Sequence, residues 1–199
     1  MFKYLVLLAA LQIAFVSCKK LNTSEANSKQ NSATEDQKTA DGPYTKKDEN
    51  GKIIESGTLK NGVPDGVRTL FQANGKPKIQ ENYTSGQFEG EYKTFHENGA
   101  IDQTGMYINN TMTGVWKRFY PNGALREEVN FADNNENGPY KEYYPSGKLK
   151  WEGTFKEGKE EGEHRLYNEE GEIIKKKDCE TGNCDVTWVK KGYEDGKLK

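Results

Sequence analysis

The feature that most constrains this chain is a pattern of turn residues that repeats every 24 residues from Gly42 almost to the C-terminus. One glycine opens each unit, a second follows nine residues later, and the position twenty residues in holds only glycine or asparagine. Both residue types tolerate a left-handed backbone, so the pattern predicts turns at fixed places in a repeat architecture. The three sets are Gly42, Gly66, Gly90, Gly114, Gly138 and Gly162; Gly51, Gly75, Gly99, Gly123, Gly147 and Gly171; and Gly62, Gly86, Asn110, Asn134, Gly158 and Gly182.

Each unit is expected to be a β-hairpin closed by a three-residue loop such as Pro121 to Gly123. Proline fits the first loop position of a type I turn that ends in a left-handed glycine. This loop would place Phe119 opposite Leu125. An aromatic then faces an aliphatic residue in nearly every unit, and such pairs contribute about 0.2 to 1 kcal/mol each, so stability accumulates by repetition. The equivalent pairs are Phe71 with Pro77, Phe95 with Ile101, Tyr143 with Leu149, and Tyr167 with Ile173.

The second turn of each unit, as at Asn61-Gly62, is expected to be a two-residue primed turn. Counting outward from these turns pairs Tyr83 with Phe88 and Tyr107 with Met112, and in the last unit Cys179 with Cys184. The α-carbons of such non-hydrogen-bonded pairs lie about 4.5 Å apart, which suits a disulfide in an exported chain. We therefore expect a Cys179–Cys184 disulfide, and the alternative is a pair of reduced, buried thiols.

The alternation of side chains along a strand predicts which residues share a face of the sheet. Phe119, Leu125 and Phe131 would share one face, together with their equivalents, as a continuous apolar stripe. A second aromatic set, two residues after the opening position, falls on the opposite face unless a bulge intervenes. An exposed ladder of this kind would be a binding surface, whereas a folded-in one would be core, which is the favoured interpretation. These candidate binding aromatics are Tyr44, Tyr92, Trp116, Tyr140 and Trp188.

The N-terminal sequence predicts that the protein is exported to the cell envelope. Residues 1–17 combine Lys3 with a short apolar run, which is typical of a secretory signal peptide. Ser17 followed by Cys18 resembles the bacterial lipobox, although Phe15 stands where leucine is usual. We expect Cys18 to be lipidated and the protein to be anchored in the envelope, at the outer membrane; the alternative is ordinary cleavage that leaves a free thiol. Residues 18–41 would provide the anchor and a disordered tether, because they contain no aromatic residue and only one leucine.

The stretch from Gly114 to Phe131, GVWKRFYPNGALREEVNF, closely resembles the MORN repeat in the variant form common in bacterial proteins, including the YwqK-like antitoxins. The resemblance covers Gly42 to about Gly182, and a degenerate seventh unit runs from Val186 to Lys199. It implies an all-β fold, an elongated single antiparallel sheet of six to seven 24-residue hairpins. The units of this domain, residues 42–199, begin at 42, 66, 90, 114, 138, 162 and 186. Such repeats generally serve as scaffolds or as surfaces for proteins and sometimes lipids.

The residues offer no catalytic constellation. His96 and His164 occupy repeat positions that elsewhere hold tyrosines, so they are interpreted as surface or cross-strand residues. No cysteine and histidine spacing resembles a zinc site, and we expect no enzyme activity, no metal and no cofactor. The formal net charge of −2 gives no electrostatic case for nucleic acid.

Two functional hypotheses follow. The favoured one is a non-enzymatic envelope lipoprotein whose repeat sheet binds a protein or lipid; its partners would be the membrane, through lipidated Cys18, and a protein of unknown identity. The alternative, which rests on the family resemblance, is an antitoxin or immunity protein of a toxin–antitoxin system. Export argues against an antitoxin whose toxin acts in the cytoplasm.

Overall fold

The computed structural model describes residues 41–194 and 197–198. The predicted signal peptide, Cys18, and the tether up to residue 40 lie outside this range. No helix of the described residues is long and apolar enough to span a membrane. The strands are β1 (Gly42–Lys47), β2 (Ile53–Lys60), β3 (Val63–Pro64), β4 (Gly66–Phe71), β5 (Pro77–Thr84), β6 (Gln87–Phe88), β7 (Gly90–Phe95), β8 (Ile101–Ile108), β9 (Thr111–Phe119), β10 (Leu125–Ala132), β11 (Asn135–Tyr143), β12 (Leu149–Lys156), β13 (Lys159–Tyr167), β14 (Ile173–Glu180), β15 (Asn183–Val189), β16 (Tyr193–Glu194) and β17 (Lys197–Leu198).

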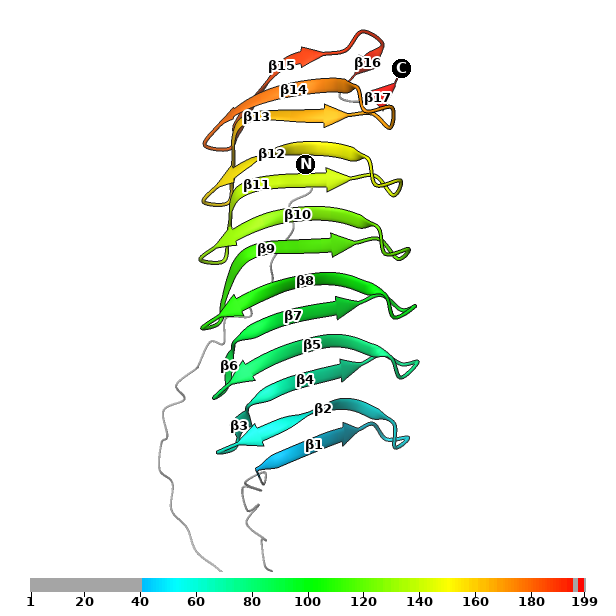
Figure 1. The fold of residues 1–199 in the computed structure, drawn as a ribbon, viewed down its shortest axis with the longest axis vertical. Helices are drawn as coiled ribbons and strands as arrows, with labels where there is room; N and C mark the ends of the chain where they lie inside the picture. Colours follow the sequence, from blue (N-terminus) through cyan, green and yellow to red (C-terminus); the bar gives the residue numbers. More distant parts are fainter. Residues whose placement is uncertain (1–40, 195–196, 199) are drawn as a thin grey trace, which may run out of the picture. The chain divides into compact units, whose positions relative to one another are not determined.

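Fifteen of these strands form one antiparallel sheet, in which the longer strands lie in chain order. The two-residue strands β3 and β6 pair with β2 and β5. Figure 1 shows the result as hairpins stacked one on another in chain order. The path begins with β1 and ends with β15, and each of these is the first strand of its repeat unit. The short strands β16 and β17 pair only with each other. The predicted all-β fold with a single antiparallel sheet is confirmed.

The three-residue turns have the expected geometry. In the unit that opens at Gly114, the N–H of Gly123 donates to the carbonyl of Tyr120 at 2.8 Å, and the N–H of Tyr120 donates to the carbonyl of Ala124 at 2.8 Å. Gly123 has a φ of 84°, the left-handed region that the repeat pattern indicated. Phe119 pairs with Leu125, and the four equivalent pairs are also as predicted.

The two-residue turns are also as predicted. Both loop residues have a positive φ, as in Asn61 at 53° and Gly62 at 77°, which defines a type I′ turn. Non-glycine residues occupy the first loop position throughout, from Asn61 to Thr181, at φ values near 50°. The turns set the register that pairs Tyr83 with Phe88 and Tyr107 with Met112.

The predicted apolar stripe through Phe119, Leu125 and Phe131 is wrong, because a bulge interrupts it. The pairing of β10 with β9 shifts between Leu125 and Glu127, so that Arg126 is an extra residue in the second strand. One extra residue reverses the alternation, and every later side chain of that strand changes face. Phe131 therefore leaves the face of Phe119 and packs against Trp116, with ring centroids 5.9 Å apart.

A second bulge occurs at the opening glycines Gly114, Gly138 and Gly162. In the pairing of β10 with β11, Val129 faces Tyr140 and Phe131 faces Glu136, so three residues of β11 stand against one of β10. Gly138 lies within this bulge at a φ of 120°. Such bulges bend a strand. We call the face of the sheet that carries Trp116 and Phe131 the inner face, and the face that carries Phe119 the outer face.

The core lies on the inner face and joins several units. Its buried centre is Trp116, Val129 and Tyr140. Half-buried apolar side chains from neighbouring units pack against this centre. They are Tyr92, Tyr107, Met112, Phe131, Trp151 and Phe155.

Both turn edges of the sheet are tied from unit to unit. At the three-residue turns, Tyr120 Oη donates to the carbonyl of Tyr143 at 2.8 Å, and Tyr144 Oη does the same to Tyr167 at 2.7 Å. His96 occupies the equivalent position, and its Nε2 lies 2.9 Å from the carbonyl of Phe119. At the opposite edge, carboxylates accept hydrogen bonds from turn N–H groups: Asp65 from Ser85, Glu89 from Asn109, and Glu161 from Thr181. Adjacent hairpins are thus held in one register.

Candidate binding surfaces and buried polar clusters

The five candidate binding aromatics do not form one exposed ladder. Trp116 is 2% exposed and Tyr140 is also buried, and both lie in the core. Tyr92 packs against Trp116 with ring centroids 5.7 Å apart, and burial raises the pKa of Tyr92 to about 12. Tyr44 is half-buried, and its hydroxyl donates to Glu55 at 2.7 Å. Only Trp188, 44% exposed, stands on the surface, so four of the five residues line the inner face and are no free binding surface.

We call the inner-face side chains two residues after each opening position the inner column. Glycines on the neighbouring strand make room for its rings. A Cβ on Gly105 would overlap the indole ring of Trp116, and a Cβ on Gly153 would overlap the imidazole of His164. Both glycines lie fifteen residues into their units, where Val129 stands in the unit between them. The rings of Trp116 and His164 therefore pack over the backbone of the unit before their own, and the glycine is what allows this approach.

At the N-terminal end of the inner face an arginine replaces the aromatic ring. Arg68 stands two residues after its opening glycine, as Trp116 does, and lies between two buried carboxylates. Its Nε is 2.9 Å from Glu55 Oε1, and its Nη1 is 2.9 Å from Glu81 Oε2. Tyr83 Oη donates to Glu81 at 3.1 Å, so hydroxyls and a guanidinium satisfy the carboxylates.

Arg68, Glu55, Glu81 and the tyrosines bonded to them form what we call the Arg68 cluster, and its charged groups shift one another's pKa values. The hydrogen bond from Arg68 lowers the pKa of Glu55 to about 2, and hydrogen bonds from Tyr44 and Lys46 act in the same direction. The same carboxylate raises the pKa of Arg68 above its ordinary value. A cavity of about 510 Å³ opens beside the cluster, lined by Tyr44, Lys46, Glu55 and Arg68 among others. Because each of these four side chains already has a partner in the cluster, the cavity offers a ligand no free charge.

His164 fills the same repeat position near the C-terminal end. Of the two predicted places, surface or cross-strand, the surface is wrong, and His164 pairs across to Lys177. Its side chain is 1% exposed, and neither ring nitrogen has a hydrogen-bond partner. The ring lies 5.8 Å from Trp151 and 6.2 Å from Phe155, centroid to centroid. Burial lowers the pKa of His164, because the charged imidazolium would be poorly solvated there.

The two cysteines lie on the two strands that follow the strand of this histidine. Cys179 on β14 pairs with Cys184 on β15, and a disulfide joins them. The carboxylate of Glu160, on β13, lies 2.9 Å from Cys184 Sγ. Lys177 Nζ lies 2.7 Å from each oxygen of Glu160 and 4.8 Å from the ring centre of Trp151. The end of the inner face is therefore a mixed cluster of sulfur, carboxylate and ammonium.

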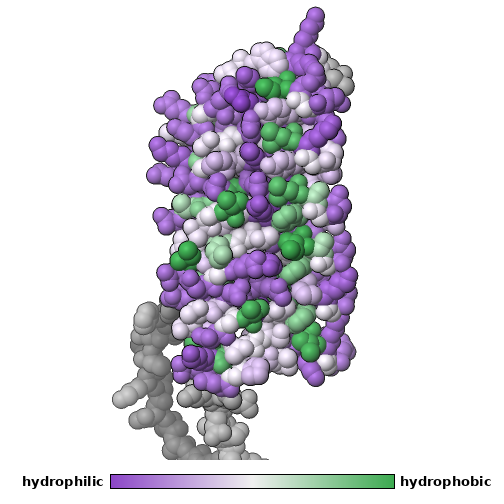
Figure 2. Space-filling model, in the orientation of Figure 1, coloured by the Kyte–Doolittle hydropathy of each residue, from purple (hydrophilic) through white to green (hydrophobic). Residues whose placement is uncertain are grey.

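The outer face carries the exposed apolar side chains of the middle units. Met106 on β8 and Val115 on β9 are 44% and 49% exposed, and Ile108 is also exposed. Near them, Lys117 Nζ pairs with Glu128 at 2.8 Å. Figure 2 shows small groups of hydrophobic side chains, set among hydrophilic ones, along the face that it draws. Apolar groups with a charged surround are typical of surfaces that bind proteins.

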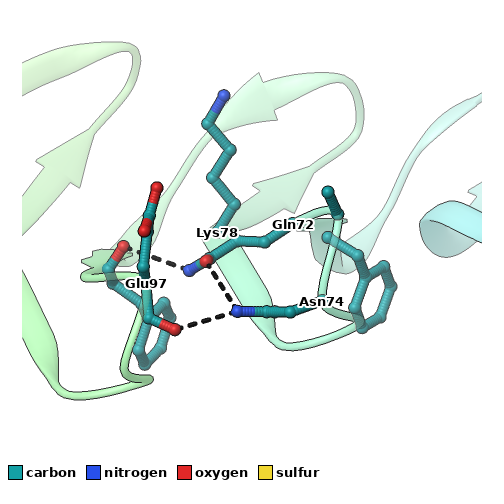
Figure 3. Close-up of a pocket in the computed structure, with 7 residues that line it drawn as sticks. Gln72, Asn74, Lys78 and Glu97 are labelled. Carbon is teal, nitrogen blue, oxygen red and sulfur yellow. Dashed lines mark hydrogen bonds between the residues drawn. The ribbon is translucent and has the colours of Figure 1, made fainter.

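A shallow hollow of about 460 Å³ lies between the three-residue turns of the second and third units. Figure 3 shows Gln72 and Asn74 inside it, with Lys78 directed away from them. The amide of Gln72 donates to the carbonyl of His96 at 2.9 Å, and that of Asn74 to the carbonyl of Glu97 at 2.9 Å. These amides are used to join two turns, so the hollow is part of the edge that ties the units together.

The comparison with protein families agrees with this geometry. The MORN repeat variant family matches five consecutive segments, residues 40–61, 64–85, 88–109, 112–133 and 136–157. The chain belongs to this family. Each matched segment ends at the type I′ turn of its unit, so the MORN segments and the hairpins have the same period. No curated protein matches the chain.

The structure extends the MORN pattern past the last matched segment, since β13 and β14 form a sixth hairpin in the same register. MORN repeats of this kind make a scaffold suited to binding. The Arg68 cluster and the burial of His164 were not predicted. Their signal was present in the sequence, because both residues stand in the column of Trp116 and Tyr140.

Proposed function

We propose that this protein is a non-enzymatic lipoprotein of the bacterial cell envelope whose MORN sheet binds a protein partner through its outer face. The observation that carries the proposal is the group of exposed apolar side chains on the outer face, Met106, Ile108 and Val115. They lie on a sheet whose units are tied together at both edges. A surface held in one geometry loses little conformational entropy on binding.

The location is argued from the N-terminal sequence. A short apolar run ends in Ser17 and Cys18, as in lipoprotein signals, and the following segment up to residue 41 lacks the apolar residues for a core. Lipidation of Cys18 through more than one acyl chain would anchor the protein stably. The segment after it would then act as a tether that lets the sheet reach partners away from the outer membrane.

The first test is the mass and acylation of the mature N-terminus after expression in a bacterium with two membranes, beside a Cys18→Ala control. We expect an acylated Cys18 in the membrane fraction and loss of both acylation and membrane attachment in the control. A cytoplasmic chain that retains Met1 would refute the lipoprotein proposal and bring the antitoxin hypothesis forward.

The second test concerns the outer face. A photoreactive residue at Met106 should give a discrete cross-linked partner in living cells. Thr154 is the matched control, because it occupies the same repeat position, is exposed, and lies two units away. Cross-linking of equal yield at both positions would argue against a partner on the middle units. Binding of the Cys18→Ala chain to lipid vesicles, without cross-linking to protein, would replace the protein partner by a lipid surface.

A further inference from the structure

Three strands bring potential metal ligands together at the C-terminal end of the inner face. Glu160 comes from β13, Cys179 from β14 and Cys184 from β15, and their ligand atoms all lie within 4.8 Å of one another. Glu160 Oε2 lies 2.9 Å from Cys184 Sγ and 3.8 Å from Cys179 Sγ. The three ligand atoms therefore already converge on one point of the fold.

A second observation is the direct pairing of the two cysteines. Cys179 on β14 stands opposite Cys184 on β15, with α-carbons 4.0 Å apart, so both sulfur atoms remain on the same side of Glu160 when the bond is reduced. His164 is not a fourth ligand of this group, because its ring packs over Gly153 on β12, on the other side of β13.

We propose that, when the disulfide is reduced, Cys179, Cys184 and Glu160 form a binding site for a thiophilic divalent cation such as Zn²⁺. Two thiolates and one carboxylate are donors that zinc accepts, and a water molecule completes a tetrahedral set. The thiolates favour zinc over calcium or magnesium, which prefer oxygen ligands. The cation takes the place of Lys177 beside Glu160, and the Lys177 ammonium keeps its contact with the face of Trp151.

The chemistry balances in two steps. A dithiol reduces the Cys179–Cys184 bond by thiol–disulfide exchange: it supplies two electrons and two protons, becomes a disulfide itself, and leaves two protein thiols. The divalent cation then forms two metal–sulfur bonds and displaces the two thiol protons into solvent. In the reverse step a disulfide oxidant takes two electrons from the two thiolates and two protons from solvent, and becomes a dithiol. The Cys179–Cys184 bond forms again and the cation is released, so occupancy of the site follows the redox state of the two cysteines.

The sequence does not reveal this site, because its ligands come from three strands and their spacing follows no zinc motif. The inference rests on the C-terminal cluster alone. It does not depend on the proposed partner of the outer face or on lipidation of Cys18.

The experiment titrates Co²⁺ into the full chain, once reduced by a phosphine under argon and once oxidised. We expect the reduced chain to bind one equivalent, with thiolate-to-cobalt charge-transfer bands and the visible bands of tetrahedral cobalt. Zn²⁺ should displace the cobalt and abolish both sets of bands. The oxidised chain should show neither set.

The variants assign the ligands. Glu160→Gln should weaken cobalt affinity by about tenfold to a hundredfold, the range seen when groups that support a metal site are removed. His164→Phe changes a ring outside the ligand group and should leave the affinity unchanged. Glu136→Gln is the matched control, because Glu136 holds the same repeat position as Glu160 with no cysteine beside it, and should bind as the unchanged chain does.

Three outcomes would overturn the proposal. The first is a reduced chain without charge-transfer bands, whether or not circular dichroism shows that it keeps its β-structure. The second is equal cobalt binding by the oxidised chain. The third is undiminished affinity in Glu160→Gln, which would leave only a cysteine pair.

Discussion

The same repeat position has two different chemistries in two regions of the inner face. In the middle of the sheet it holds Trp116, which is buried among Tyr92, Tyr107 and Phe131. Near the N-terminal end it holds Arg68, which bridges two carboxylates. Both units nevertheless have the same turns and the same strand pairing. The turn residues therefore fix the backbone of a unit. The residue at the position of Trp116 and Arg68 can differ between units when the side chains packed against it differ as well.

The two regions should differ most when the inner side chain is truncated. Trp116→Ala leaves a cavity in a packed aromatic cluster, and we expect a loss of about 3 to 5 kcal/mol in the free energy of unfolding. Urea denaturation followed by circular dichroism measures this. Trp188→Ala is the control, since Trp188 is exposed, and should stay within about 0.5 kcal/mol of the unchanged chain. Equal losses in the two variants would show that the aromatic column does not form the core.

Removal of Arg68 tests the polar region in the same way. Arg68→Met leaves Glu81 without its guanidinium and Glu55 with only its weaker partners, and we expect a loss of about 1 to 3 kcal/mol. The double variant Arg68→Trp with Glu81→Val copies the pair formed by Trp116 and Val129. Urea denaturation should find it more stable than Arg68→Met. If it is the less stable of the two, inner positions are not interchangeable between units.

Acid should distinguish the regions by a smaller effect. The pKa of Glu55 is about 2 in the folded chain against an ordinary value of 4.5, so the unfolded chain binds the proton more tightly. The contribution of this carboxylate is therefore complete above about pH 4.5 and is lost as the pH falls toward about 2. Urea denaturation across this range should show a shallower fall in stability for Glu55→Gln. A fall as steep as that of the unchanged chain would assign the acid sensitivity to other groups.

The smallest effect should come from the turn edge, where the two regions are predicted to behave alike. Tyr120→Phe removes the hydrogen bond to the carbonyl of Tyr143, and Gln72→Leu removes the one to the carbonyl of His96. Each should cost about 0.5 to 1.5 kcal/mol in urea denaturation. A large difference between them would mean that the inner position influences how strongly a turn is tied to the next unit.

The turns and pairs could be predicted because their signal is a backbone requirement. Asn110 and Gly123 stand where φ is positive, and few other residues are suited to such positions. The face assignment failed because the bulge at Arg126 has no such signal. The equivalent residues have nothing in common, being Ile54, Lys78, Asp102, Lys150 and Ile174. Since one extra residue exchanges the faces, the position of Phe131 could not be read from alternation alone.

The burial of His164 was missed for a different reason. A histidine is usually found at a surface or in a satisfied polar site. The prediction was based on this property of histidine and not on the repeat position that His164 occupies. The column is the better guide, because it places His164 with Trp116 and Tyr140. The same rule would have placed Arg68 on the inner face, where it is half-buried, and would have indicated carboxylates on the strands beside it.

The sheet begins with β1 and ends with β15, and both are first strands of a unit. Inside the sheet a first strand always lies between second strands, and the register shifts in both pairings, as for β9 with β10 and for β12 with β13. Two copies of the chain placed end to end would bring two first strands together, and no pairing of that kind occurs within the described sheet. The free ends are thus poorly matched to each other, and Pro43 and Lys46 on β1 discourage pairing further. A repeat that could in principle continue without limit is in this way kept from growing into a fibre.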